Sequence, residues 1–134
     1  MKIIVIGGGA WGTALAVSAA RNGGNGAAVT LWVRDAEQAR TLAQQRENRR
    51  YLPGYALAPG LQVSAQPLPG LLAGPTPFDL AIIASPMAGL RGLLVQLQGC
   101  GVPVAWLCKG FEASQDGGPG LLGHEVQALS LIHI

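Results

Sequence analysis

Short apolar runs without polar alternation recur along the chain and predict β-strands that are buried on both faces of a sheet. Because both faces of such strands are apolar, the sheet should be parallel and covered by helices on its two sides. Four clear runs and a weaker one, the third in the order of the chain, occupy residues 2–6, 29–33, 61–64, 79–84 and 103–107.

Segments with helical character separate these runs. Residues 10–21 are mostly small and lead into Asn-Gly-Gly, a typical helix stop. Asp35 and Gln38 resemble a capping box and predict a helix through about residue 47. Another helix is indicated by leucines at helical spacing: Leu90, Leu93, Leu94 and Leu97. The alternation predicts an α/β fold with a doubly wound parallel sheet in a single domain.

Residues 48–77 are rich in proline and glycine and favour an ordered loop, with a weak helical signal near Leu71. The segment NRRYLPG at residues 48–54 is expected to pack Tyr51 and Leu52 onto the domain while its arginines face solvent. We assign this segment no catalytic role.

The first strand runs directly into a turn with the spacing G-x-G-x-x-G, formed by Gly7, Gly9 and Gly12. Alone, the pattern is weak in a chain with 20 glycines, and a simple connecting turn is the alternative. Between a buried strand and a helix, however, it has the context that dinucleotide binding requires. The free N–H groups and dipole of the helix would stabilise the charge of the pyrophosphate. The turn therefore predicts a Rossmann domain that binds NAD or NADP.

The end of the second strand should decide which dinucleotide is preferred. An acidic residue there binds the ribose 2′-hydroxyl of NAD, whereas a nearby arginine accommodates the 2′-phosphate of NADP. This chain has Arg34 followed by Asp35, which is better used as the cap of the next helix. We expect NADPH as the cofactor, with NADH as the alternative and an ordinary solvated arginine as the other interpretation of Arg34.

Composition narrows the classes of function. Hydrophobic residues make up 49% of the chain and charged residues 12%, which argues for a folded core and against disorder. The net charge of +2 is too small for a nucleic-acid footprint, and basic residues gather only at Arg46, Arg49 and Arg50. The apolar segments are too short for a signal peptide or a membrane span, so we expect a cytoplasmic protein without membrane insertion.

Cysteine and histidine give no indication of a metal site. Cys100 and Cys108 lack the spacing of a metal-ligand motif or a disulfide scaffold and are expected to be buried, reduced thiols. Nothing places His124 or His133 beside a carboxylate, so neither is assigned a catalytic role. We expect no bound metal.

Four motifs support a more specific interpretation: GGGAWGTALA at 7–16, LWVR at 31–34, NRRYLPG at 48–54 and WLCKGFE at 106–112. Together they resemble the bacterial NAD(P)-dependent glycerol-3-phosphate dehydrogenases. The resemblance implies reversible hydride transfer between NAD(P)H and the keto carbon of dihydroxyacetone phosphate. The product, sn-glycerol 3-phosphate, is a phospholipid precursor. The resemblance also implies that Ala10, Trp11 and Arg34 contact the dinucleotide.

Two further residues at the carboxyl ends of strands take roles from the resemblance. Lys109 should lie where nicotinamide and substrate meet and contact both, although a surface lysine is the alternative. A lysine at this edge of an α/β sheet can attract a phosphate-bearing substrate. Pro86 should flank the cofactor, and Met87 stands where the family commonly has a serine, so a hydroxyl contact there is in doubt.

The resemblance also implies that parts of the enzyme are missing. The catalytic, proton-donating lysine of the family lies in a helical substrate domain that these 134 residues do not include, so the chain alone should be inactive. A homodimer is one expectation for the full-length form. Residues 117–134 depart from the polar, helical sequence expected there and are interpreted as an irregular, artificial or truncated end.

Two other functions stay open. A Rossmann dehydrogenase with another substrate, such as a ketopantoate reductase or a hydroxyacid dehydrogenase, would share the glycine turn but leave NRRYLPG and KGFE unexplained. A stand-alone NADPH-binding regulatory module would explain the missing substrate domain. A truncated glycerol-3-phosphate dehydrogenase accounts for both the motifs and the unusual terminus, and we rank it first.

Overall fold

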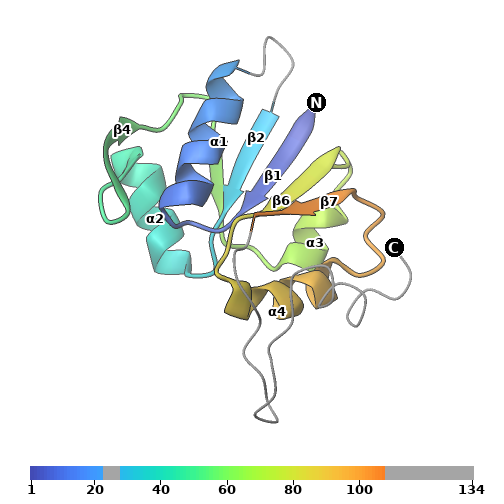
Figure 1. Cartoon of the computed structure of the whole chain (residues 1–134). Coiled ribbons are helices and arrows are strands. Elements are labelled where there is room, and N and C mark those ends of the chain that lie inside the picture. Colours follow the sequence, from blue (N-terminus) through green and yellow to red (C-terminus); the bar gives the residue numbers. More distant parts are fainter. Residues whose placement is uncertain (23–27, 108–134) are drawn as a thin grey trace, which may run out of the picture.

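Five parallel strands form the central sheet of the protein, shown in Figure 1 as a computed structural model that describes residues 1–22 and 28–107. Every pair of neighbouring strands in this sheet runs parallel, as the apolar runs predicted. Across the sheet the strands are β5 (Gln62–Ser64), β2 (Ala28–Trp32), β1 (Lys2–Ile6), β6 (Leu80–Ile83) and β7 (Val104–Trp106). The chain moves outward from β1 to one edge and then returns to add β6 and β7 on the other side. The strand order therefore reverses between β1 and β6, where open α/β sheets bind ligands.

Helices cover both faces of the sheet, which confirms the predicted doubly wound fold (Figure 1). On one side lie α1 (Ala10–Asn22) and α2 (Ala36–Gln45), and on the other lie α3 (Leu68–Leu72) and α4 (Met87–Leu97). The central strand β1 supplies both cores, because successive side chains of a strand point to opposite faces. Val5 belongs to the same core as Leu42 of α2, whereas Ile4 belongs to the core that contains Leu90 of α4.

The helix α4 carries the leucine pattern that predicted it. Leu90, Leu93, Leu94 and Leu97 are all buried against the sheet. The half-buried Cys100 packs at the edge of this core, so the expectation of a buried thiol is only partly met. Cys108 lies outside the described residues.

The helix α2 begins as predicted but ends earlier. The carboxylate of Asp35 accepts a hydrogen bond of 3.0 Å from the backbone N–H of Glu37, which makes Asp35 the N-cap. Gln38 does not complete a capping box, since its side-chain amide donates to the carbonyl of Gly8 at 3.2 Å. The helix ends at Gln45 instead of residue 47.

Arg46 stops α2 and accounts for the difference. It adopts the left-handed conformation with φ 53°, and its guanidinium Nη2 donates to the carbonyls of Ala58 at 2.6 Å and Leu61 at 2.9 Å. These contacts join the end of α2 to the segment before β5. Arg46 is therefore a structural residue.

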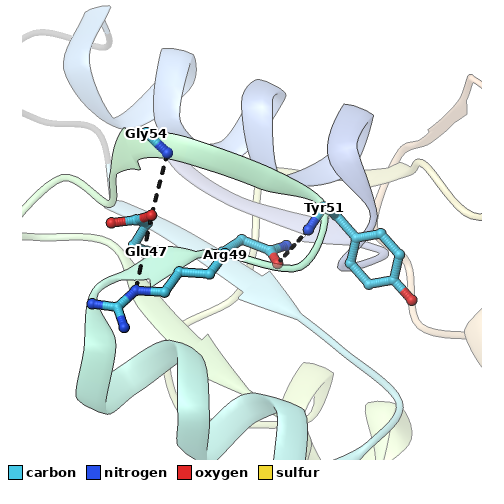
Figure 2. A network of polar contacts seen from close by, with 5 residues as sticks. Glu47, Arg49, Tyr51 and Gly54 are labelled. Atoms are coloured by element: carbon cyan, nitrogen blue, oxygen red, sulfur yellow. Dashed lines mark hydrogen bonds and ion pairs between the residues drawn. The ribbon is translucent and has the colours of Figure 1, made fainter.

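A hairpin of β3 (Glu47–Asn48) and β4 (Leu52–Ala56) replaces the loop expected for NRRYLPG. Figure 2 shows the Glu47 carboxylate between two partners: the backbone N–H of Gly54 at 3.2 Å and the Nε of Arg49 at 3.9 Å. Leu52 is half-buried, but Tyr51 is 42% exposed, and its ring extends away from the hairpin (Figure 2). The prediction that Tyr51 packs onto the domain is therefore wrong.

Among residues 1–22 and 28–107, no helix combines the length and apolar character needed to cross a bilayer. Within the same ranges, no three side chains of His, Cys, Asp or Glu lie together as a metal site would require.

Candidate functional site

A pocket of about 540 Å³ opens beside the point where the strand order reverses. The glycine turn lines this pocket and is joined to the end of β2, where the N–H of Gly7 donates to the carbonyl of Trp32 at 2.9 Å. On the other side of β1, the N–H of Ala84 donates to the carbonyl of Ile6 at 2.8 Å. Polar and backbone groups from several segments line the pocket: residues 7–9, Arg34, Gln38, Tyr51, Ser85 and Pro86.

The three glycines of the motif have different surroundings. Gly7 has φ 132°, and a β-carbon there would lie 2.8 Å from the carbonyl oxygen of Ala84. A β-carbon on Gly12 would overlap the carbonyl oxygen of Gly7, so these two glycines permit the tight turn and the close packing of α1 on β1. A β-carbon on Gly9, in contrast, would meet no atom within 4 Å.

The open space at Gly9 is the feature that fits a dinucleotide. Gly9 lines the pocket, and a side chain there would occupy space that a pyrophosphate needs to approach the backbone. Beside it, α1 begins at Ala10, and its first N–H groups have no partners within the helix. The first turn of α1 carries no acidic residue, so no carboxylate there compensates the positive end of the helix dipole. The arrangement suits an anionic ligand.

Arg34 lies at the position that the cofactor argument requires. It follows β2, is exposed to solvent and lines the pocket. Within the described part of the chain, its guanidinium has no hydrogen-bond or ion-pair partner. The neighbouring Asp35 caps α2 and does not line the pocket. The charged side chain at the end of β2 that does line it is therefore the cation Arg34.

A second, mostly apolar pocket of about 570 Å³ continues from the other side of the glycine turn. Trp11 lines it with 73% of its surface exposed, and Leu107 faces it with 54% exposed. Pro86 lines both pockets. Met87, in contrast, is 8% exposed and packs in the core of α4, and a thioether cannot replace a serine hydroxyl as a donor.

Several residues that the sequence analysis singled out lie beyond residue 107. Lys109 lies outside the described residues, together with His124, His133 and the whole of residues 117–134. Only the first two residues of the WLCKGFE motif are described, and they belong to the end of β7 and the position after it.

The structure also adds pocket residues that the sequence argument did not assign to the site. Gln38 was interpreted as part of a capping box, and Tyr51 as a packing residue of a loop. Both line the pocket because α2 and the β3–β4 hairpin fold back beside the glycine turn. For Tyr51 the NRRYLPG motif was the available signal, since it accompanied the glycine turn in the family resemblance, whereas none of the four motifs contains Gln38.

Comparison with known proteins agrees with this geometry. The family described as NAD-dependent glycerol-3-phosphate dehydrogenase N-terminus matches residues 2–126. The chain is 52% identical over 128 residues to a glycerol-3-phosphate dehydrogenase [NAD(P)+] of Acidovorax ebreus, covering 96% of this chain and 36% of that protein. It is 54% identical over 132 residues to the protein of the same name from Delftia acidovorans, covering 96% and 38%.

Solved structures give the same result. The crystal structure of glycerol-3-phosphate dehydrogenase from Coxiella burnetii superimposes with a TM-score of 0.80 at 28% identity, covering 98% of this chain and 38% of that one. The chain therefore spans little more than a third of the length of these relatives. The comparisons confirm the resemblance that the four motifs carried. This chain belongs to the family of NAD-dependent glycerol-3-phosphate dehydrogenase N-terminal domains.

Proposed function

We propose that this chain is the cofactor-binding part of a glycerol-3-phosphate dehydrogenase that reduces dihydroxyacetone phosphate to sn-glycerol 3-phosphate with NAD(P)H. The observation that carries the proposal is the open space at Gly9, held between a strand end and the start of α1. The family match and the relatives' printed names supply the substrate class. All 134 residues are assigned to one dinucleotide-binding domain.

Different residues of the two pockets would bind different groups of the cofactor. The turn at Gly9 and the first N–H groups of α1 would hold the pyrophosphate, while Arg34 would hold the 2′-phosphate of NADPH. Trp11 and Pro86 would flank the part of the cofactor that reaches the second pocket. The reduced nicotinamide supplies the hydride. NADPH is the preferred cofactor in this proposal, and NADH is the alternative.

The reaction needs groups beyond the described residues. Lys109 is proposed to contact the nicotinamide and the phosphate of the substrate at the carboxyl end of β7. The proton donor is expected in the part of the relatives that this chain does not cover, so the chain alone should bind cofactor without turnover. A cytoplasmic location and a homodimeric full-length form complete the proposal.

Titration of the 134-residue chain with NADPH and with NADH, followed by tryptophan fluorescence, tests the cofactor role. Trp32 lines the first pocket and the exposed Trp11 lines the second, so binding should change the emission. Saturable binding is the expected result. Failure of both nucleotides to bind would overturn the proposal.

A chimera tests the reaction. In the Delftia acidovorans relative, the matching N-terminal segment would be replaced by this chain, and oxidation of NADPH by dihydroxyacetone phosphate would be followed by absorbance. We expect turnover by the chimera and none by the 134-residue chain. A folded chimera that binds NADPH but does not reduce this substrate would contradict the assigned reaction.

A further inference from the structure

The backbone carbonyl of Gly8, in the middle of the glycine turn, is held by two side-chain amides from outside the turn. The Nδ2 of Asn48 donates to it at 2.9 Å, and the Nε2 of Gln38 donates at 3.2 Å. Asn48 comes from β3 and Gln38 from α2. Two separate elements therefore fix the orientation of one peptide group.

The orientation of the Gly8–Gly9 peptide group sets the direction of the N–H of Gly9. Because a trans peptide is planar, the N–H of Gly9 points opposite to the carbonyl of Gly8. When the two amides hold that carbonyl on one side, the N–H of Gly9 is directed to the other. Gly9 is also the glycine whose β-carbon position is open and which lines the pocket. The N–H is thus presented where an anionic ligand would lie.

Asn48 is built into the core as a fully engaged amide. It is 2% exposed, and its Nδ2 donates to Thr13 Oγ1 at 2.8 Å as well as to Gly8. Its Oδ1 accepts the backbone N–H of Tyr51 at 3.3 Å. A buried amide is stable only when its hydrogen bonds are made, so these contacts keep Asn48 in one orientation.

We infer that Asn48 is a positioning residue for cofactor binding: it orients the Gly8–Gly9 peptide so that the N–H of Gly9 donates to the pyrophosphate. Gln38 supports the same carbonyl from α2. The inference rests on the proposed dinucleotide function and gives the NRRYLPG segment a role in binding. Asn48 acts through the backbone of the turn and does not line the pocket.

The substitution Asn48→Asp isolates this role. Aspartate keeps the size of the side chain and the acceptor for the N–H of Tyr51, but it places a carboxylate oxygen against the carbonyl of Gly8. We expect affinity for NADPH, NADH and ADP to fall by the same factor, about tenfold, because the three ligands share the pyrophosphate. Affinity for adenosine 2′-monophosphate should not change, since this probe reaches Arg34 without using the turn.

A matched control uses the second hydrogen bond of the same amide. Thr13→Val removes the acceptor for Asn48 Nδ2 within the fully buried core, while the donation to Gly8 remains. This variant should lose stability but keep its affinity for ADP. Equal ADP affinity in Asn48→Asp and the unsubstituted chain would overturn the inference. So would a loss of adenosine 2′-monophosphate binding as large as the loss for ADP, which would indicate general disruption.

A measurement on the unsubstituted chain covers the case in which Asn48→Asp does not fold. The amide proton resonance of Gly9 should shift when ADP is added and stay in place when adenosine 2′-monophosphate is added. An unchanged resonance at saturating ADP would overturn the inference while leaving the dinucleotide proposal intact. If ADP, NADPH and NADH all fail to bind, the proposed function itself fails.

Discussion

A β-carbon on Gly12 would overlap the carbonyl oxygen of Gly7, so the first turn of α1 lies against the end of β1 with no room for any side chain. We expect Gly12→Ala to destabilise the protein by about 1–3 kcal/mol, as overpacking of a core does. It should also weaken NADPH binding, because the turn must shift. Urea unfolding and nucleotide titration measure the two effects.

The control for this substitution is Gly92→Ala in α4. Gly92 is exposed, and a β-carbon there would meet no atom within 4 Å. Alanine is favoured over glycine inside a helix, so this change should stabilise the protein by about 0.5–1 kcal/mol. If Gly12→Ala behaved in the same way, the close contact between α1 and β1 would be disproved.

Gly9→Val should separate binding from folding. The new side chain would extend into open space, so the free energy of unfolding should change by no more than about 1 kcal/mol. The same side chain would take the space of the pyrophosphate, and affinity for NADPH and NADH should both fall more than about tenfold. Gly60→Val, at another open position away from the pocket, serves as the control. Unaltered nucleotide binding by Gly9→Val would place the ligand elsewhere.

Arg34→Ala should change the preference between the two nucleotides. Among residues 1–22 and 28–107 nothing pairs with the Arg34 guanidinium, which lines the pocket, and loss of charge-assisted hydrogen bonds to a 2′-phosphate costs about 1.5–3 kcal/mol. NADPH affinity should therefore fall about tenfold to hundredfold, while NADH affinity stays the same. Arg40→Ala, on the exposed side of α2, controls for the loss of one positive charge. Equal losses for NADPH and NADH would rule out recognition of the 2′-phosphate.

Leu94→Ala tests the packing of α4 on the sheet. Leu94 is 0% exposed, and its truncation should cost about 2–5 kcal/mol in the free energy of unfolding. Its neighbour Val95 is 52% exposed, so Val95→Ala should change the stability by no more than about 0.5 kcal/mol. Chemical denaturation of both variants gives the comparison. Similar losses of stability in both variants would contradict the finding that α4 packs Leu94 against the sheet and exposes Val95.

The strands of the central sheet and the helices that flank it could be predicted because the sequence patterns that specify them are local. The apolar run at β1, the leucine spacing of α4 and the cap at Asp35 each lie within one element. Their observed bounds agree with the predicted ranges to within one residue for β1 and β2. The glycine motif also pointed to the pocket where we propose that the cofactor binds, because the motif depends on the local order of strand, turn and helix.

The hairpin and the end of α2 could not be predicted in the same way. Arg46 stops the helix with help from carbonyls at Ala58 and Leu61, which are 12 and 15 residues further along the chain. The sequence near Arg46 contains no glycine or proline that would predict the end of the helix there. Contacts with a later segment decided the local conformation.

By itself, the sequence determined the parallel sheet, its order of elements and the glycine turn, because strand burial, helical spacing and turn chemistry act over a few residues. Only the tertiary structure decided which amides hold the Gly8 carbonyl. Asn48 is 40 residues from Gly8 and Gln38 is 30 residues away, and both reach it because α2 and the hairpin fold back beside the turn. A hydrogen bond between distant residues depends on the packing of whole elements, and no local pattern of residues specifies it.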